Sequence, residues 1–431
     1  MKAAVVDQNG NWRGKRVPVE QLEKVLDGQM RLPVSICNLD IWGADIAGSP
    51  LVFASGDGDG QCRWTGRGPL PMPWTKHPSA LIPLTLHTDS GTPFPGDPRQ
   101  VLANVLSRYR KSGLTPVVAF ELEFYLTRMI DGQLSAPRFA STNTVFADES
   151  IYSLQELDEI DDLLQAVNHA CAEQDIPLDT ALGESGAGQF ELNLKHGSDP
   201  MKAADDAILL KRVIQGVARQ FGSIATFMAK PYADCAGSGM HVHFSLLDAA
   251  GRNIFNNDSD EGSPELQHAV AGLLDSLIPC AAIFAPNLNS YRRLQPETHA
   301  PTQVTWGYEN RTTALRIPGG QPASRRIEHR VAGADANPYL VLAAILGAAL
   351  LGMEKKSTPQ AAQTGNGYEA TTASLPTDWQ SALDLLEQSQ VVETIFPPEF
   401  LPLFLATKRQ ELKRLSQHMS AFELATYLET C

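Results

Sequence analysis

The chain has 431 residues, of which 43% are hydrophobic, and its formal net charge is −14. This length and apolar content exclude a disordered chain and allow more than one domain around a large core. The excess of acidic residues argues against a nucleic-acid groove or an anionic membrane surface as partner. The six cysteines are scattered without a CxxC pair, so we expect reduced thiols in a cytoplasmic protein.

Residues 1–92 contain short strand-like runs and turn signals, and we expect them to form an amino-terminal domain. Gln8-Asn9-Gly10 follows an apolar pair and is typical of a hairpin turn. The second predicted domain covers residues 97–431, where Asp97 and Pro98 are the expected N-cap and first residue of a helix. Strands and helices then mix without strict βαβ alternation, which favours an α+β fold.

Residues 120–124, 190–194 and 240–244 each alternate apolar side chains with Glu, Asn or His. Successive side chains of a strand point to opposite faces, so each segment would bury its apolar residues and present its polar ones. If the three strands are neighbours in one sheet, their polar faces form a patch rich in carboxylates. Such a patch is unfavourable when buried unless positive charge lies beside it, and divalent cations are the simplest source.

Several acids and imidazoles are candidate ligands for these cations. Mg²⁺ and Mn²⁺ prefer oxygen ligands, and Mn²⁺ also accepts one imidazole. A zinc or iron site built from two histidines and one glutamate is the competing interpretation. The candidates are Glu121, Glu123, Glu184, Glu191, His241, His243 and Glu328.

Arginines are concentrated between residues 292 and 330. Guanidinium groups bind carboxylates and phosphates through two hydrogen bonds, and arginines beside divalent cations are typical of phosphoryl-transfer sites. The alternative is a helix surface with many salt bridges. The chain has neither a P-loop nor a Rossmann fingerprint, so a nucleotide would be held in another way. The arginines are Arg292, Arg293, Arg311, Arg316, Arg325, Arg326 and Arg330.

The carboxyl-terminal part is predicted to be largely helical. Asn337-Pro338 begins an apolar run that ends near Met353, which is short of the roughly 20 residues that span a bilayer. We therefore expect a buried core helix and no membrane partner. Residues from about 402 to 429 are expected to be helical, and their basic residues are expected to form a solvated face. These basic residues are Lys408, Arg409, Lys413 and Arg414.

Together these segments resemble the glutamine synthetase family. The resemblance implies a β-grasp-like amino-terminal domain and a catalytic domain with a curved antiparallel sheet flanked by helices. It also implies a homo-hexameric or homo-dodecameric ring with active sites between subunits. The motifs that carry it are Glu121-Leu122-Glu123-Phe124, residues 184–191, residues 237–245, residues 289–294 with Asn310-Arg311-Thr312, and residues 325–330 with Ala336-Asn337-Pro338-Tyr339.

The resemblance assigns roles to positions of this chain. One metal, Mg²⁺ or Mn²⁺, would be held by Glu123, Glu184 and Glu191, and a second by Glu121, His241 and Glu328. The glutamate carboxylates would contact Arg293 and Arg330, and the glutamate amino group would contact the backbone of Gly237. The residues at ATP and transition-state positions are His243, Ser245, Arg311, Arg316 and Arg326.

Three departures from the family pattern concern the attacking amine. The flap glutamate that helps to bind ammonium falls on His299, and Pro33 is nearest to the position of the second ammonium-binding acid. Ala236 stands where the family has Asn before the glycine. Without the two acids, ammonium lacks the charges that would bind and deprotonate it. His299 could serve as the base, and Glu297 is a nearby alternative.

The resemblance is strongest to the γ-glutamylpolyamine or γ-glutamylamine synthetase branch. The expected enzyme is an ATP-dependent carbon–nitrogen ligase that joins the γ-carboxylate of glutamate to an amine through γ-glutamyl phosphate. The alternatives are ammonium-dependent glutamine synthetase, a non-catalytic scaffold and a guanidino kinase. We name Trp42, Trp64 and Trp74 as candidates for the amine pocket, because the amino-terminal region reaches a neighbouring site in this family.

Overall fold

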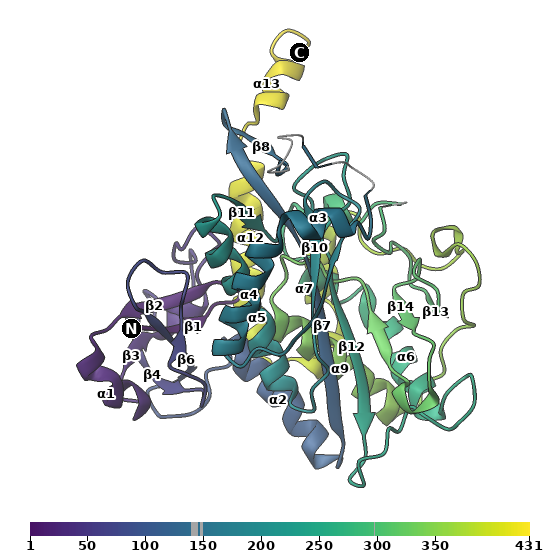
Figure 1. Ribbon diagram of the computed structural model, residues 1–431. Helices are drawn as coiled ribbons and strands as arrows, with labels where there is room; N and C mark the ends of the chain where they lie inside the picture. The colour runs from purple at the N-terminus through teal and green to yellow at the C-terminus, as the bar shows by residue number, and fades with distance from the viewer. Residues whose placement is uncertain (139–144, 147–149, 297) are drawn as a thin grey trace.

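The computed structural model describes residues 1–431 except 139–144, 147–149 and 297. The described residues form two β-sheets with helices packed beside them, so the α+β prediction is confirmed. Figure 1 shows the smaller, amino-terminal sheet on one side and the larger sheet, with its long central strands, in the middle of the molecule.

The smaller sheet is built around a parallel pair of strands, β1 (Lys2–Val6) and β6 (Ala80–His87). The predicted hairpin at residues 8–10 is present, and Gly10 has a φ of 77°, which glycine adopts without strain. A short helix, α1 (Leu22–Leu26), precedes the third strand, and this arrangement fits a β-grasp. The other strands are β2 (Trp12–Arg16), β3 (Arg31–Pro33), β4 (Asp59–Trp64) and β5 (Leu70–Pro71).

The larger sheet has the order β13-β14-β15-β12-β7-β10-β9, and β8 and β11 pair with β7 outside this path. The sheet is antiparallel as expected, apart from one parallel pair, β13 and β14. The strands are β7 (Thr115–Ile130), β8 (Gln133–Ser135), β9 (Leu178–Gly183), β10 (Gln189–Leu194), β11 (Ile224–Thr226), β12 (Met240–Leu247), β13 (Trp306–Tyr308), β14 (Leu315–Ile317) and β15 (Ile327–His329).

One face of this sheet packs on helices. Phe120, Leu122 and Phe124 of β7 are fully buried in the main hydrophobic core, which α2, α5, α6 and α9 complete. The helices are α2 (Pro98–Lys111), α3 (Leu154–Glu159), α4 (Asp161–Glu173), α5 (Pro200–Gln220), α6 (Pro264–Leu277), α7 (Ala281–Phe284), α8 (Ser290–Arg293), α9 (Pro338–Lys355), α10 (Trp379–Glu387), α11 (Gln390–Ile395), α12 (Phe400–Ser416) and α13 (Ala421–Tyr427).

Both predicted helix starts are observed. The Asp97 side chain accepts a hydrogen bond from the backbone N–H of Arg99, and the Asn337 side chain accepts one from that of Tyr339. Within the described residues, α9 alone is long and apolar enough to cross a membrane, and 83% of its apolar window is buried inside the structure. It is a core helix, as expected.

The basic residues of the last helices do not all form a solvated face. The predicted tail helix is two helices, α12 and α13, and α13 projects away from the rest (Figure 1). Lys408 is fully buried, donates a hydrogen bond to Asn9 and lies 3.0 Å from a carboxylate oxygen of Glu411. The expectation for Lys408 was wrong because its partner Asn9 comes from the distant amino-terminal hairpin.

The crossing of α6 and α9 depends on two glycines. A Cβ atom on Gly272 would lie 2.2 Å from the carbonyl oxygen of Ala348, and one on Gly352 would lie 2.2 Å from that of His268. Real side chains do not approach backbone this closely, so the helices can pack at this distance only because both residues lack Cβ.

We expect Gly272→Ala to lower the midpoint of thermal unfolding, because the added methyl must push α6 away from α9. Overpacking of this kind destabilises by about 1–3 kcal/mol. The matched control is Gly197→Ala, because a Cβ at Gly197 meets no atom within 4 Å. Equal midpoints for the two variants, measured by calorimetry, would contradict this account of the crossing.

Candidate active site

The register of the central strands brings the predicted acids together. β10, β7 and β12 are neighbours, with Glu191 opposite Glu123 and His241 opposite Glu121. Glu328 on β15 lies opposite His243. The apolar residues of these strands face the helices. The acids and imidazoles therefore project from the opposite face of the sheet.

This face forms the floor of a cavity of about 680 Å³. Most of the predicted site residues line this cavity. Glu328, which is buried, and Ser245 are not in the lining. The predicted residues in the lining are Glu121, Glu123, Glu184, Glu191, Gly237, His241, His243, Arg293, His299, Arg311, Arg316, Arg326 and Arg330.

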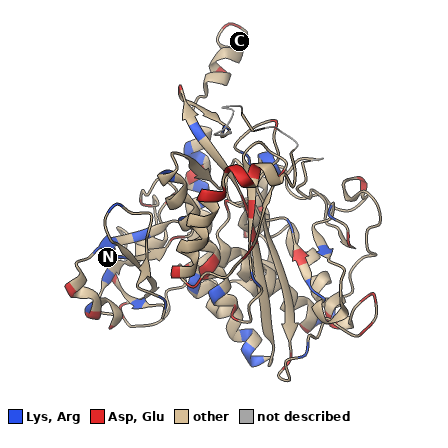
Figure 2. Ribbon diagram, viewed as in Figure 1, with Lys and Arg blue, Asp and Glu red and all other residues tan. Residues whose placement is uncertain are grey.

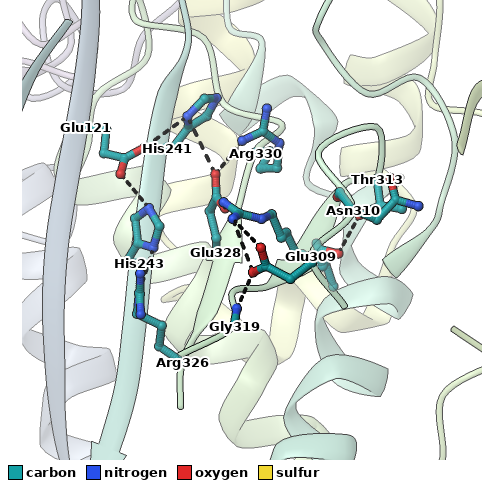
Figure 3. A network of polar contacts seen from close by, with 12 residues as sticks. Glu121, His241, His243, Glu309, Asn310, Thr313, Gly319, Arg326, Glu328 and Arg330 are labelled. Carbon is teal, nitrogen blue, oxygen red and sulfur yellow. Dashed lines mark hydrogen bonds and ion pairs between the residues drawn. The ribbon is translucent and has the colours of Figure 1, made fainter. Parts of the chain in front are cut away.

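Glu121 is held between two imidazoles, as Figure 3 shows. Its carboxylate lies 2.8 Å from Nε2 of His243 and 3.3 Å from Nδ1 of His241. Burial of Glu121 opposes ionisation, but the hydrogen bonds and charges of the two histidines outweigh it and hold the pKa of Glu121 below its usual range. Nε of Arg326 donates to Nδ1 of His243 at 3.2 Å, which leaves the Nε2 proton of His243 for Glu121.

Glu328 joins the histidines to the arginines. Arg316 donates to its carboxylate at 2.8 Å, Arg330 also donates to it, and Nδ1 of His241 lies 3.8 Å away (Figure 3). Burial opposes ionisation of Glu328, but Arg330 and the two histidines lower its pKa to about 2. Glu309, which the sequence analysis did not single out, makes a second ion pair with Arg316 at 3.3 Å.

Among the described residues, neither Glu184 nor Glu191 forms an ion pair, and the charge of Arg330 only partly opposes the shift at Glu184. Burial raises the pKa of Glu184 to about 8, and the charge of Glu123 adds to this effect. Burial raises the pKa of Glu191 to about 9, with contributions from Glu121, Glu123 and Glu184. The protein therefore holds several carboxylates together without enough positive charge to keep all of them ionised at neutral pH.

Two groups of these side chains are spaced to hold a cation. The ligand atoms of Glu121, His241 and Glu328 lie within 4.8 Å of one another, and so do those of Glu123, Glu191 and His241. The first group is the set predicted for one metal. In the second group His241 takes the place that the prediction gave to Glu184. Oxygen-rich ligands with one shared imidazole suit a hard divalent cation.

Backbone and arginine close the cavity on the β12 side. A Cβ atom on Gly237 would lie 2.6 Å from Cγ of Arg293, and one on Gly239 would lie 2.8 Å from its Nη2. Arg293 donates to the backbone carbonyl of Val331 at 2.8 Å, which fixes its guanidinium. Gly239 N–H donates to Glu123 at 2.7 Å, so the glycine-rich turn also orients a predicted ligand.

His299 lies at the mouth of the cavity, is exposed and has a φ of 63°, in the left-handed region. The alternative base, Glu297, lies outside the described residues. The sequence analysis did not assign several other lining residues to the site, because their segments carry no alternating polar pattern. These are Ile151, Tyr152, Leu182, Thr298, Asn366 and Tyr368.

Acidic residues follow Ile151 and Tyr152 along the chain. Figure 2 shows them in red on α3 and at the start of α4, without a Lys or Arg between them. A segment of one charge sign beside a cavity raises the local concentration of cations. The acids are Glu156, Asp158, Glu159, Asp161 and Asp162.

The chain is similar to known proteins over nearly its whole length. The family described as glutamine synthetase, catalytic domain, matches residues 95–427. The chain is 38% identical over 435 residues to γ-glutamylputrescine synthetase of Escherichia coli K12, covering 99% of this chain and 90% of that protein. It is 33% identical to a glutamate–isopropylamine ligase of a Pseudomonas species, covering 100% of this chain and 95% of that protein. A solved structure described as a GmaS/ADP complex superposes with a TM-score of 0.85 at 26% identity, covering 99% of this chain and 96% of that one.

The raised pKa values of Glu184 and Glu191 predict how stability depends on pH. Both carboxyls start from 4.5 and reach about 8 and about 9 in the folded protein. At a pH between about 5 and about 8, both carboxyls are ionised in the unfolded chain but keep their protons in the folded chain. The free energy of unfolding of metal-free protein should therefore fall as pH rises from about 5 to about 9.

Thermal unfolding of chelator-treated protein at several pH values measures this slope. We expect Glu191→Gln to flatten it, and we expect added Mn²⁺ or Mg²⁺ to raise the midpoint most at high pH. Glu393→Gln on the exposed face of α11 is the control and should keep the full slope. A slope in Glu191→Gln as steep as that of the unaltered protein would be evidence against this charge balance.

Proposed function

The chain belongs to the glutamine synthetase family and is a carbon–nitrogen ligase, and we propose how its cavity joins the γ-carboxylate of glutamate to an organic amine. ATP is the co-substrate. Two relatives that match it over nearly its whole length are named for organic amines, putrescine and isopropylamine. This observation favours ATP-dependent γ-glutamylamide formation over the use of ammonium.

We propose that the carboxylates on the floor of the cavity bind cations that neutralise the charge of the phosphates. Bound Mg²⁺ or Mn²⁺ would neutralise phosphate charge and polarise the reacting oxygens. The buried carboxylates fit this role because two of them have raised pKa values and form no ion pair within the described part of the chain. Glu123, Glu184 and Glu191 would hold one ion, and Glu121, His241 and Glu328 would hold the other.

Arginines and backbone position the substrates. Arg293 and Arg330 would bind the carboxylates of glutamate, and the backbone of Gly237 would contact the glutamate amino group. Charge that builds up during phosphoryl transfer would be stabilised by preorganised guanidinium groups. Arg311, Arg316, Arg326 and His243 would contact the phosphates of ATP, with Ser245 farther along the same face of β12.

The reaction would proceed in two steps. The γ-carboxylate oxygen of glutamate attacks the terminal phosphorus of ATP, releasing ADP and forming γ-glutamyl phosphate. The amine, which is protonated at neutral pH, first loses one proton. Its nitrogen then attacks the carbonyl carbon, the carbon–oxygen bond to phosphate breaks, and the second proton passes to the released phosphate. His299 at the mouth of the cavity is the proposed proton acceptor. We also propose a cytoplasmic homo-hexameric or homo-dodecameric ring, with active sites between subunits.

Phosphate release from ATP tests the ligase activity directly. We expect it to require glutamate, Mg²⁺ or Mn²⁺ and one class of amine from a panel of putrescine, spermine, ethanolamine, butylamine, benzylamine and ammonium. The product mass should equal that of glutamate plus amine minus water. Ammonium as the best substrate would contradict the proposal, and no turnover with any amine would favour a different acceptor.

His299→Asn tests the proton acceptor without disturbing the backbone, because Asn adopts the left-handed region readily. Loss of a general base lowers turnover by about 10²–10⁴-fold. We expect this loss with the best alkylamine, which is protonated at neutral pH, but not with hydroxylamine, which is already unprotonated. Equal losses with both nucleophiles would show instead that His299 shapes the pocket.

A further inference from the structure

A second cavity, of about 940 Å³, lies between the amino-terminal hairpin and the catalytic part of the chain. It shares no lining residue with the catalytic cavity. Its walls come from the β1–β2 turn, α5, the segment that ends in α8, and α10. None of these lining residues has a predicted role towards metal, glutamate or ATP, and Trp42, a candidate for the amine pocket, lies here and not in the catalytic cavity, so this cavity needs a separate explanation.

The walls carry unpaired positive charge. Lys211 and Arg212 on α5 and Arg292 on α8 line the cavity. Among the described residues, none of these three forms an ion pair with a carboxylate. A fourth cation, Arg13, is already paired with Asp7 at 2.8 Å.

The two acids that line the cavity are engaged elsewhere. Asp335 accepts hydrogen bonds through Oδ2 from Asn287 at 2.7 Å and Ser290 at 2.6 Å, although its buried Oδ1 has no partner. Glu411 lies 3.0 Å from the ammonium group of Lys408. Burial lowers the pKa of Lys211 to about 8, although the charge of Asp335 opposes this shift.

The lining residues include buried hydrogen-bond donors that have no acceptor as a partner. Nε1 of Trp12, Nε1 of Trp379 and Nε of Arg212 are buried and have no hydrogen-bond partner. These groups can donate but cannot accept, and a buried donor without a partner is unfavourable. The side chain of Trp379 is 1% exposed. The remaining walls are aromatic or apolar, including Trp42 and Phe227.

We propose that this cavity binds a small organic anion, a carboxylate or phosphate ester with a planar or apolar portion. Arg212, Arg292 and Lys211 hold the charged group, because guanidinium and ammonium groups bind oxyanions strongly. The aromatic and apolar walls cover the planar portion. The site lies apart from the chemistry and does not depend on the proposed reaction.

Calorimetric titration with phenyl phosphate tests the site, because this probe combines an anion with a planar ring. We expect one binding site per chain in the unaltered protein. Arg212→Gln and Arg292→Gln should each weaken binding by about tenfold or more, as expected when a charged hydrogen bond is lost. Arg292 is exposed, so this variant tests the site even if Arg212→Gln impairs folding.

Two controls locate the binding. Arg110→Gln changes an exposed arginine on α2 outside the cavity and should leave the affinity unchanged. Arg311→Gln changes the catalytic cavity and should also leave it unchanged. Inorganic phosphate should bind more weakly than phenyl phosphate, because it lacks the ring.

Three results would overturn the proposal. They are no binding to the unaltered protein, an affinity that both Arg212→Gln and Arg292→Gln leave intact, and a loss of binding in Arg311→Gln alone. Equal affinities for phenyl phosphate and inorganic phosphate would overturn the assignment of the planar portion.

Discussion

Repulsion between buried carboxylates is the constraint around which this molecule is arranged. Glu121, Glu123 and Glu191 stand on neighbouring strands of one sheet face, at separations that the strand register fixes. The protein compensates only part of this charge. Histidines and arginines hold Glu121 and Glu328 ionised, while Glu184 and Glu191 are left with raised pKa values. A site built in this way is complete only when further positive charge enters it.

The opposite face of the same strands explains why the protein can tolerate this arrangement. Phe120, Leu122 and Phe124 are buried against helices, and they alternate along the strand with Glu121 and Glu123, which line the cavity. Shifting a strand by one residue would place phenylalanine in the cavity and glutamate in the core. The apolar core therefore fixes the register, and the register fixes the spacing of the acids.

Much of this could be predicted from the sequence, because strand periodicity is a local property. The alternation in residues 120–124, 190–194 and 240–244 was enough to place most of the acids and imidazoles on one face. What periodicity could not provide was contact between distant segments. The ion pair of Glu309 with Arg316, the burial of Lys408 and the parallel pairing of β13 with β14 all depend on tertiary structure. Ser245 shares the face of His243 but lies beyond the cavity, since a shared face does not determine how far a cavity extends.

Two hydrogen bonds that join the amino-terminal domain to α12 connect residues that are far apart in the sequence. Asn38 donates to Thr407, and Asn9 donates to Glu411, across 369 and 402 positions of sequence. During synthesis the amino-terminal sheet leaves the ribosome long before these partners exist. Closing such long loops is slow, because the entropy of the intervening chain is lost before the contacts form. The contacts between the amino-terminal sheet and α12 are therefore expected to form late in folding.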